Sequence, residues 1–181
     1  MRGIGTKRRL ALGLAFFFFS CGLWAGTYTG ATVSANTTVS ANCTISATGL
    51  DFGAYDPSGA QTTTALDNGT AQIRVACVQG SAPTIALSLG LNASGSVRRM
   101  KNTSVTDYLE YELYQPPNAS PGTACSFPAS AVWGTSGANL FTPTAPSSKG
   151  TRAYFICATV PAGQDPSIGI YNDIITASVN F

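Results

Sequence analysis

Two carboxylates on one strand-like segment are candidates for general acid and base catalysis. Glu110 and Glu112 stand two positions apart in "TDYLEYELYQ", and two carboxylic acids on one face are what glycoside hydrolysis requires. No third polar group follows that would tune either acid. We therefore expect a solvated strand face and no enzymatic activity. A secreted glycosidase that relies on Glu110 is the enzymatic alternative.

Other reactive residue types are sparse. The chain has no histidine, which removes the usual general base near neutral pH and the commonest metal ligand. No nucleophile elbow, phosphate-binding loop or metal signature is present. The segment "SVRRMKN" could bind an anionic surface, but a solvated turn is expected. Trp133 could stack on a sugar, yet burial in the core is expected. We predict no catalytic residue, metal or cofactor.

Cysteines are the one reactive type that recurs. The chain has five, and Cys21 lies within an apolar leader, so four remain for the folded part: Cys43, Cys77, Cys125 and Cys157. An even number in an exported chain predicts two disulfides, and three pairings are open. Sequential pairing would close two loops of about 35 residues, each worth roughly 4 kcal/mol in the chain-entropy model.

The first 25 residues are typical of a secretory signal. A basic stretch, "MRGIGTKRR", precedes the apolar run "LALGLAFFFF" and the small residues of "SCGLWAG". Four of the ten basic residues lie in this segment and all eight acidic residues lie after residue 50, so the net charge changes from +2 to −2 on its removal. The basic balance therefore belongs to the signal, and nucleic acid is not an expected partner.

Short strands are the elements expected to position these residues. Only 10% of the residues are charged, against about 25% in a typical domain, and no window shows a helical period. Alternating apolar residues and frequent turn signals predict about seven strands in an antiparallel, immunoglobulin-like β-sandwich. The expected strands lie at residues 37–47, 70–80, 82–91, 106–115, 130–141, 152–160 and 174–181.

The two ends of this domain carry strand-like segments with no evident partner. Toward the C-terminus, "IYNDIITASVNF" places four apolar side chains on one face: Ile175, Ala177, Val179 and Phe181. This pattern predicts a sheet edge beside an unfilled apolar groove. The repeat "TVSAN" occurs twice, at residues 32–36 and 38–42. The first copy lies in "GTYTGATVSAN", before the first predicted strand. That segment is interpreted either as a flexible terminus or as a spare strand.

The sequence resembles the spore coat protein U domain family, which includes pilins of archaic, Csu-type chaperone–usher pili. The resemblance covers about residues 39–181. It rests on "NCTISATGLDFGAYDP", "IRVACVQG", "YELY", "VWG" and "VPAGQDPSIGIYNDIITASVNF". It implies an incomplete immunoglobulin-like fold that lacks its last strand and is completed by a donor strand from another molecule.

The resemblance also implies partners and roles. A periplasmic chaperone would lend a strand, an outer-membrane usher would replace it with the extension of the next subunit, and identical or related pilins would form a head-to-tail fibre. Cys43 and Cys77 match the family's disulfide. The acceptor groove would be lined by Ile175, Ala177, Val179 and Phe181. The donor strand would present Thr29, Ala31, Val33 and Ala35, a register preferred over Tyr28, Gly30, Thr32 and Ser34.

The expected organisation is a signal peptide at residues 1–25, a donor-strand extension at 26–38 and the pilin domain at 39–181. The expected product is a fimbrial subunit on the surface of a Gram-negative bacterium, supporting attachment and biofilm formation. A single-domain adhesin or glycan-binding module and a secreted coat protein that never polymerises are the alternatives left open.

Overall fold

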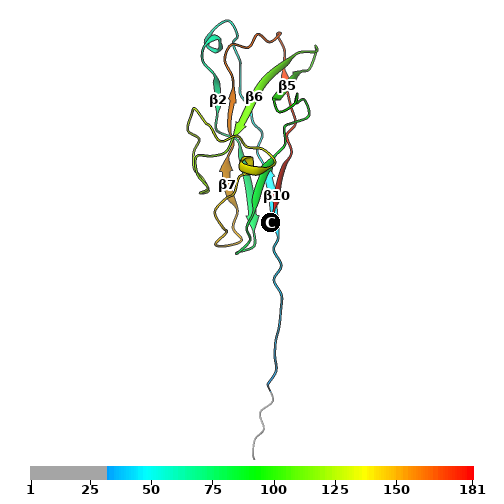
Figure 1. Cartoon of the computed structure of the whole chain (residues 1–181), viewed down its shortest axis with the longest axis vertical. Coiled ribbons are helices and arrows are strands. Elements are labelled where there is room, and N and C mark those ends of the chain that lie inside the picture. Colours follow the sequence, from blue (N-terminus) through cyan, green and yellow to red (C-terminus); the bar gives the residue numbers. More distant parts are fainter. Residues whose placement is uncertain (1–31) are drawn as a thin grey trace, which may run out of the picture. The chain divides into compact units, whose positions relative to one another are not determined.

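The computed structural model describes residues 32–181 (Figure 1). The chain divides into two units, Met1–Thr37 and Thr38–Phe181. In the first unit, the described residues 32–37 are exposed and have no regular secondary structure. The predicted signal peptide and the predicted donor residues Thr29 and Ala31 lie outside the described residues.

The second unit is an all-β domain, as predicted. Its antiparallel strands form sheets in the orders β1-β3-β7, β10-β4 and β2-β8-β6-β5-β9. Two short 3₁₀ helices, Ala60–Thr62 and Gly137–Asn139, are the helical turns of the described part. The strands are β1 (Cys43–Ala47), β2 (Leu66–Asn68), β3 (Gln72–Cys77), β4 (Thr84–Leu87), β5 (Arg98–Asn102), β6 (Tyr108–Tyr114), β7 (Arg152–Phe155), β8 (Cys157–Val160), β9 (Tyr171–Asn172) and β10 (Ala177–Asn180).

The apolar core forms between these sheets from the faces that the alternation predicts. On β6 the side chains of Leu109, Tyr111 and Leu113 are buried, while the residues between them are more exposed. Trp133 is fully buried, donates its indole N–H to the Ile85 carbonyl at 2.9 Å, and so satisfies its one polar atom. The prediction that Trp133 lies in the core is confirmed.

One long alternating stretch serves two sheets. The sequence predicted a single strand over residues 152–160, but β7 pairs with β3 and β8 pairs with β2 and β6. The break falls at Ile156, whose N–H donates to the Ala71 carbonyl at 2.8 Å. Buried side chains continue on one face through the break, at Tyr154, Ile156 and Val160. The chain can therefore change sheets without interrupting the apolar pattern.

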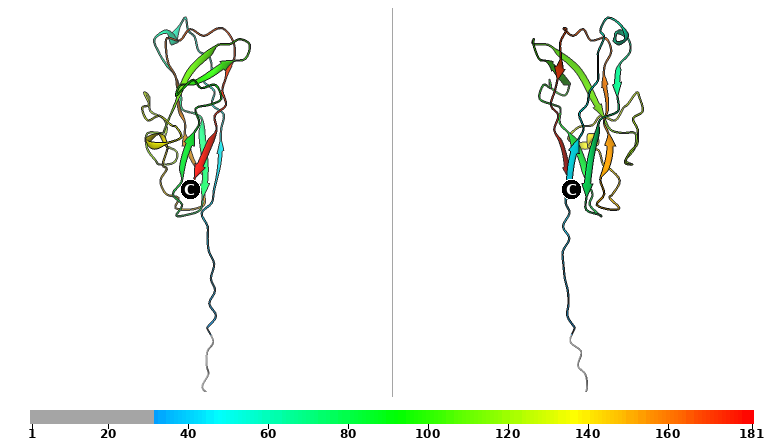
Figure 2. Two further views of the ribbon diagram at one scale, coloured as in Figure 1. Left: turned by 45° about the vertical axis from the view of Figure 1, so that its right-hand side comes forward. Right: turned by 180° about the vertical axis from the view of Figure 1, so that it is seen from behind.

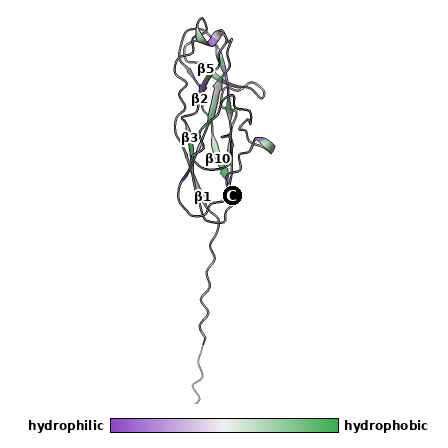
Figure 3. Ribbon diagram, turned by 90° about the vertical axis from the view of Figure 1, so that its left-hand side faces the viewer, coloured by the Kyte–Doolittle hydropathy of each residue, from purple (hydrophilic) through white to green (hydrophobic). Residues whose placement is uncertain are grey.

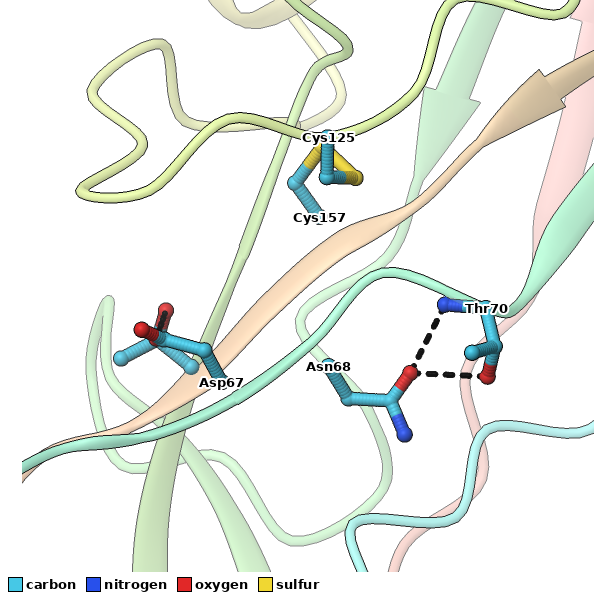
Figure 4. Close-up of a disulfide and its surroundings, with 6 residues drawn as sticks. Asp67, Asn68, Thr70, Cys125 and Cys157 are labelled. Carbon is cyan, nitrogen blue, oxygen red and sulfur yellow. Dashed lines mark hydrogen bonds between the residues drawn. A yellow bond between two sulfur atoms is a disulfide. The ribbon is translucent and has the colours of Figure 1, made fainter.

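Two disulfides form in the domain, as predicted. Cys43 bonds Cys77, and these residues are directly opposite each other in the β1–β3 ladder. Cys125 bonds Cys157 and ties the long segment after β6 to β8, close to Asp67 and Asn68 (Figure 4). A side chain at Gly69 would lie 2.7 Å from the Cys125 Cβ, so glycine permits the close approach of this segment.

Two expectations about charged residues are wrong. The "SVRRMKN" segment is not a solvated turn, because Arg98 lies on β5 and is fully buried. Its guanidinium forms an ion pair with Glu112 and also donates to the Trp133 carbonyl at 2.6 Å. Glu112, whose side chain is 25% exposed, is therefore tied to a buried arginine, whereas Glu110 is exposed as expected. A buried arginine requires such partners, because an unpaired charge in the interior is costly.

Candidate strand-acceptor groove

The candidate site lies between the free edges of two sheets. β1 is hydrogen-bonded to β3 alone, and β10 is hydrogen-bonded to β4 alone. Cα atoms of β1 and β10 come within 8 Å of each other, yet no ladder joins them within residues 32–181. Figure 2 shows β1 in cyan and β10 in red side by side, and Figure 3 shows the same pair beside β3. Each strand thus keeps one row of unpaired backbone groups.

The inner face of the C-terminal edge packs against the core. Ile175, Ala177 and Val179 are half-buried against the core residues, and the intervening Thr176 and Ser178 are exposed. Phe181, predicted on the same face, is 54% exposed. The structure thus places three of the four predicted groove residues against the core at the free edge.

Two cavities open along this edge. The first, of about 340 Å³, reaches core side chains and is bounded by residues 47–52 on one wall and 171–177 on the other. The second, of about 790 Å³, lies between residues 50–57 and 166–172. Both are lined by Leu50, Phe52, Met100, Tyr171 and Asn172. The two cavities therefore form one continuous depression, which we call the edge groove.

A carboxylate stands at the midpoint of the edge groove, between β9 and β10. The Asp173 carboxylate accepts hydrogen bonds from the N–H groups of Leu91 and Asn92, at 2.9 and 3.1 Å. The Tyr111 hydroxyl donates to its other oxygen at 2.6 Å. Burial, and then the hydrogen bond to Asp173, raise the pKa of Tyr111, so this hydroxyl stays a donor. Asp173 thus fixes the position between β9, which pairs with β5, and β10, which pairs with β4.

Gly90 makes room for this carboxylate. Its φ is +91°, in a region that residues with a side chain rarely adopt. A Cβ built there would lie 1.8 Å from a carboxylate oxygen of Asp173. Both the backbone conformation and the available space therefore require glycine at this turn.

A second carboxylate holds the far end of the edge. Asp107 accepts hydrogen bonds from the backbone N–H of Ser167, at 2.5 Å, and from the Tyr171 hydroxyl, at 2.8 Å. These hydrogen bonds, the Ser167 N–H first, hold the pKa of Asp107 well below its usual range. The edge groove is thus a depression with both apolar and polar lining, between backbone segments anchored by two charged groups.

Several groove residues were not predicted from the sequence. Leu50, Phe52 and Met100 pack against the core from the opposite wall and floor. A signal was present, because "GLDFG" places apolar residues two apart directly after the first strand. Among the predicted donor residues, Val33 and Ala35 are exposed. Thr29 and Ala31 lie outside the described range, so the donor role stays a prediction.

The geometry does not favour the enzymatic alternative. Glu112 is held by the buried Arg98, so it is not free to share acid and base roles with Glu110. Within the described residues, no group of three or more His, Cys, Asp or Glu side chains could hold a metal ion.

A search for membrane-spanning elements, confined to residues 32–181, finds no helix of sufficient length and apolarity.

Comparisons with known proteins identify a family for the chain. Residues 29–178 match the Spore Coat Protein U domain. Over 140 residues the chain is 35% identical to Protein U of Myxococcus xanthus, covering 73% of this chain and 71% of that protein.

A solved structure shares the fold. It is a chain of the CsuC–CsuE chaperone–tip adhesion subunit pre-assembly complex, from archaic chaperone-usher Csu pili of Acinetobacter baumannii. The TM-score is 0.53 at 18% sequence identity, and the match covers 80% of this chain. This chain spans 41% of the length of that one. At this identity the likeness concerns the fold alone.

Proposed function

The chain belongs to the Spore Coat Protein U domain family, and from that membership we propose that it is a structural subunit of a surface fibre. A periplasmic chaperone captures the exported subunit, an outer-membrane usher receives it, and identical or related subunits polymerise by donor-strand exchange. The fibre stands on the surface of a Gram-negative cell and supports attachment and biofilm formation. In this proposal residues 1–25 are a cleaved signal, residues 26–38 contribute the donor strand and residues 39–181 form the acceptor domain.

The observation that carries the proposal is the edge groove. Two neighbouring sheet edges lack a hydrogen-bonded partner on their facing sides, and a cavity reaches the core where these edges end, at Ala47 and Ala177. A strand that enters there gains backbone hydrogen bonds from the edge and apolar contacts from the core. An extended peptide can supply the backbone hydrogen bonds and the apolar contacts together, so a peptide is favoured over a small molecule or a metal ion.

The apolar contribution comes from residues that are already half-buried. Ile175 and Ala177 lie on one side of the groove and Leu50 and Phe52 on the other; Val179 continues the same half-buried face along β10. Covering apolar surface contributes about 25 cal/mol per Å², so covering a few hundred Å² is worth several kcal/mol. The predicted donor side chains Thr29, Ala31, Val33 and Ala35 are small, and backbone pairing would then supply much of the remaining affinity.

Co-expression with a chaperone tests the proposal. The subunit is produced with and without a periplasmic chaperone encoded beside an usher, and the purified material is weighed by native mass spectrometry. We expect a one-to-one complex with the chaperone and polymers without it. A stable monomer that forms without a chaperone and whose groove is filled by its own chain, even after residues 26–37 are deleted, would refute the proposal. The deletion matters because the chain's own N-terminal segment could otherwise fill the groove.

A coat protein that does not polymerise is the second candidate. The description of the family, which refers to a spore coat, favours it. Such a protein would share the fold but would keep its groove free or permanently covered. Electron microscopy of the purified, exported protein separates the two candidates, because only the first predicts fibres.

A further inference from the structure

The two cavities of the edge groove are displaced along its length. On the C-terminal edge, the first is lined by residues 171–177 and the second by residues 166–172. Their centres are therefore offset by about five residues, or on the order of 16 Å at the rise of an extended strand. An occupant that fills both needs two bulky apolar side chains on one face, about this far apart.

The described N-terminal segment carries such a pair. The repeat "TVSAN" places Val33 and Val39 six residues apart, and they are 93% and 77% exposed. Six is an even number, so both side chains point to the same face of an extended chain. Their separation is about 20 Å. Between them, on the same face, stand the smaller Ala35 and Thr37.

We infer that the segment 33–39 of a second copy of this chain occupies the edge groove, with Val33 in the first cavity and Val39 in the second. The inference rests on the proposed strand exchange and specifies its register. Every ladder of the domain is antiparallel, and antiparallel pairing is slightly the more stable form. In an antiparallel register, Val33 stands opposite Ile175, and Val39 opposite Gly169.

The residues between the two valines fit the polar midpoint of the groove. In this register Ala35 faces Asp173, whose carboxylate is occupied by the Tyr111 hydroxyl and the turn at Leu91. A methyl group fits beside this group, whereas a large apolar side chain there would cover a carboxylate. Thr37 faces Tyr171 in the same way.

Gly169, opposite the second valine, adds no side chain to the groove. A Cβ at this position would lie 2.4 Å from the side chain of Asn102, which is buried, so glycine permits the close approach of Asn102. The bulk needed in the second cavity must then come from the incoming strand. Val39 supplies it.

This register extends the donor by one residue beyond the predicted extension at residues 26–38, and it adds groove-facing side chains after Ala35, the last of the four that the sequence predicted. Only residues 40–42 then separate the donor from Cys43, the first residue of β1. This three-residue connection spans at most about 11 Å. If the donor ended at Ala35, the connection would be the seven residues 36–42, which span about 25 Å. Neighbouring domains of the fibre would be held close together by a short connection.

Aspartate substitutions test whether Val39 enters the groove. We compare Val33→Asp and Val39→Asp with the matched changes Ser34→Asp and Ser40→Asp. All four residues are exposed in the unassembled chain, so the domain should fold in each variant, and the yield of chaperone complex controls for this. We expect the two valine variants to polymerise at least about tenfold more slowly in a sedimentation assay, because each would bury an unpaired charge. The serine variants should remain near the unaltered rate.

The outcomes separate the register from the proposed function. If the unaltered protein polymerises and Val39→Asp behaves like Ser40→Asp, the register is wrong while strand exchange stands. If the unaltered protein does not polymerise with chaperone and usher present, both fail.

A disulfide test fixes the direction of the donor. Ile168 is fully exposed and stands opposite Ser40 in the antiparallel register, but opposite Thr32 in the parallel register that fills the same cavities. The native cysteines of the folded domain are all bonded to one another. We therefore expect an intermolecular disulfide in fibres of Ile168→Cys with Ser40→Cys. Cross-linking with Thr32→Cys instead would overturn the proposed direction.

Discussion

Replacing Val179 with aspartate should abolish capture of a strand along the free edge of β10, whereas the same change at the neighbouring Ser178 should have little effect. Both residues belong to β10 and have the same free backbone edge. Val179 faces the core and is half-buried, and Ser178 faces outward. The pair therefore separates the side-chain contribution from the backbone contribution at one place in the fold.

The expected loss of affinity can be estimated from the part of the Val179 side chain that the incoming strand would bury. Burying a whole valine side chain is worth about 1.5–3 kcal/mol, and half of this one is already covered, so the donor adds about 1 kcal/mol. A carboxylate at the same place costs about 2 kcal/mol or more, because it finds no partner in the apolar groove. The total of about 3 kcal/mol corresponds to about a 150-fold loss of affinity. Val179→Ala loses the first contribution alone, or about fivefold.

The assay is competition for a chaperone. Tagged chaperone is co-expressed with the unaltered subunit and one variant, and mass spectrometry gives the ratio of the two in the purified complex. Unfolding midpoints of the isolated variants separate loss of capture from loss of folding. Equal effects of Val179→Asp and Ser178→Asp would refute the reasoning, because they would make β10 an ordinary strand with no side-specific partner.

Three further predictions concern the groups that shape the groove. Gly90→Ala should lower the free energy of unfolding by about 2 kcal/mol more than Gly80→Ala, since both have positive φ but the Cβ at Gly80 meets nothing within 4 Å; urea unfolding measures the difference. Glu112→Gln should cost about 2–4 kcal/mol because it leaves its buried arginine partner unpaired, whereas Glu110→Gln should stay within about 0.5 kcal/mol; similar losses would contradict the assigned ion pair. The pKa of Asp107 is lower in the folded state than its ordinary value. Its stabilising effect should therefore be complete above about pH 4 and lost as the pH falls further, so unfolding between pH 2 and 5 should be less pH-dependent in Asp107→Asn.

Side-chain alternation predicted the strands whose inner faces enter the core. The face of β6 with Leu109, Tyr111 and Leu113, and the burial of Trp133, followed from a period of two and from the apolar area of the residues. Alternation within a strand does not specify which other strand it pairs with. The stretch through Ile156 alternates without interruption, yet its two halves belong to different sheets.

The charged residues show another limit of the sequence. Arg98 and Glu112 are separated by a turn and lie on adjacent strands, so their pairing depends on which face of each strand is inward. The same applies to the groove: one wall was predicted from the apolar C-terminal edge, but the opposite wall at Leu50 and Phe52 depends on how the chain leaves β1. Long-range register decides such contacts, and a local pattern does not specify it.

Hydrogen exchange can show whether the free edge of β10 receives a strand from another molecule. Amide exchange over residues 176–181 is compared between the polymer and a monomer that lacks residues 26–41. We expect the amides directed away from β4 to exchange rapidly in the monomer and at least about a hundredfold more slowly in the polymer. Identical protection in the two samples would rule out strand capture at β10, because the edge would then be either permanently covered or never used.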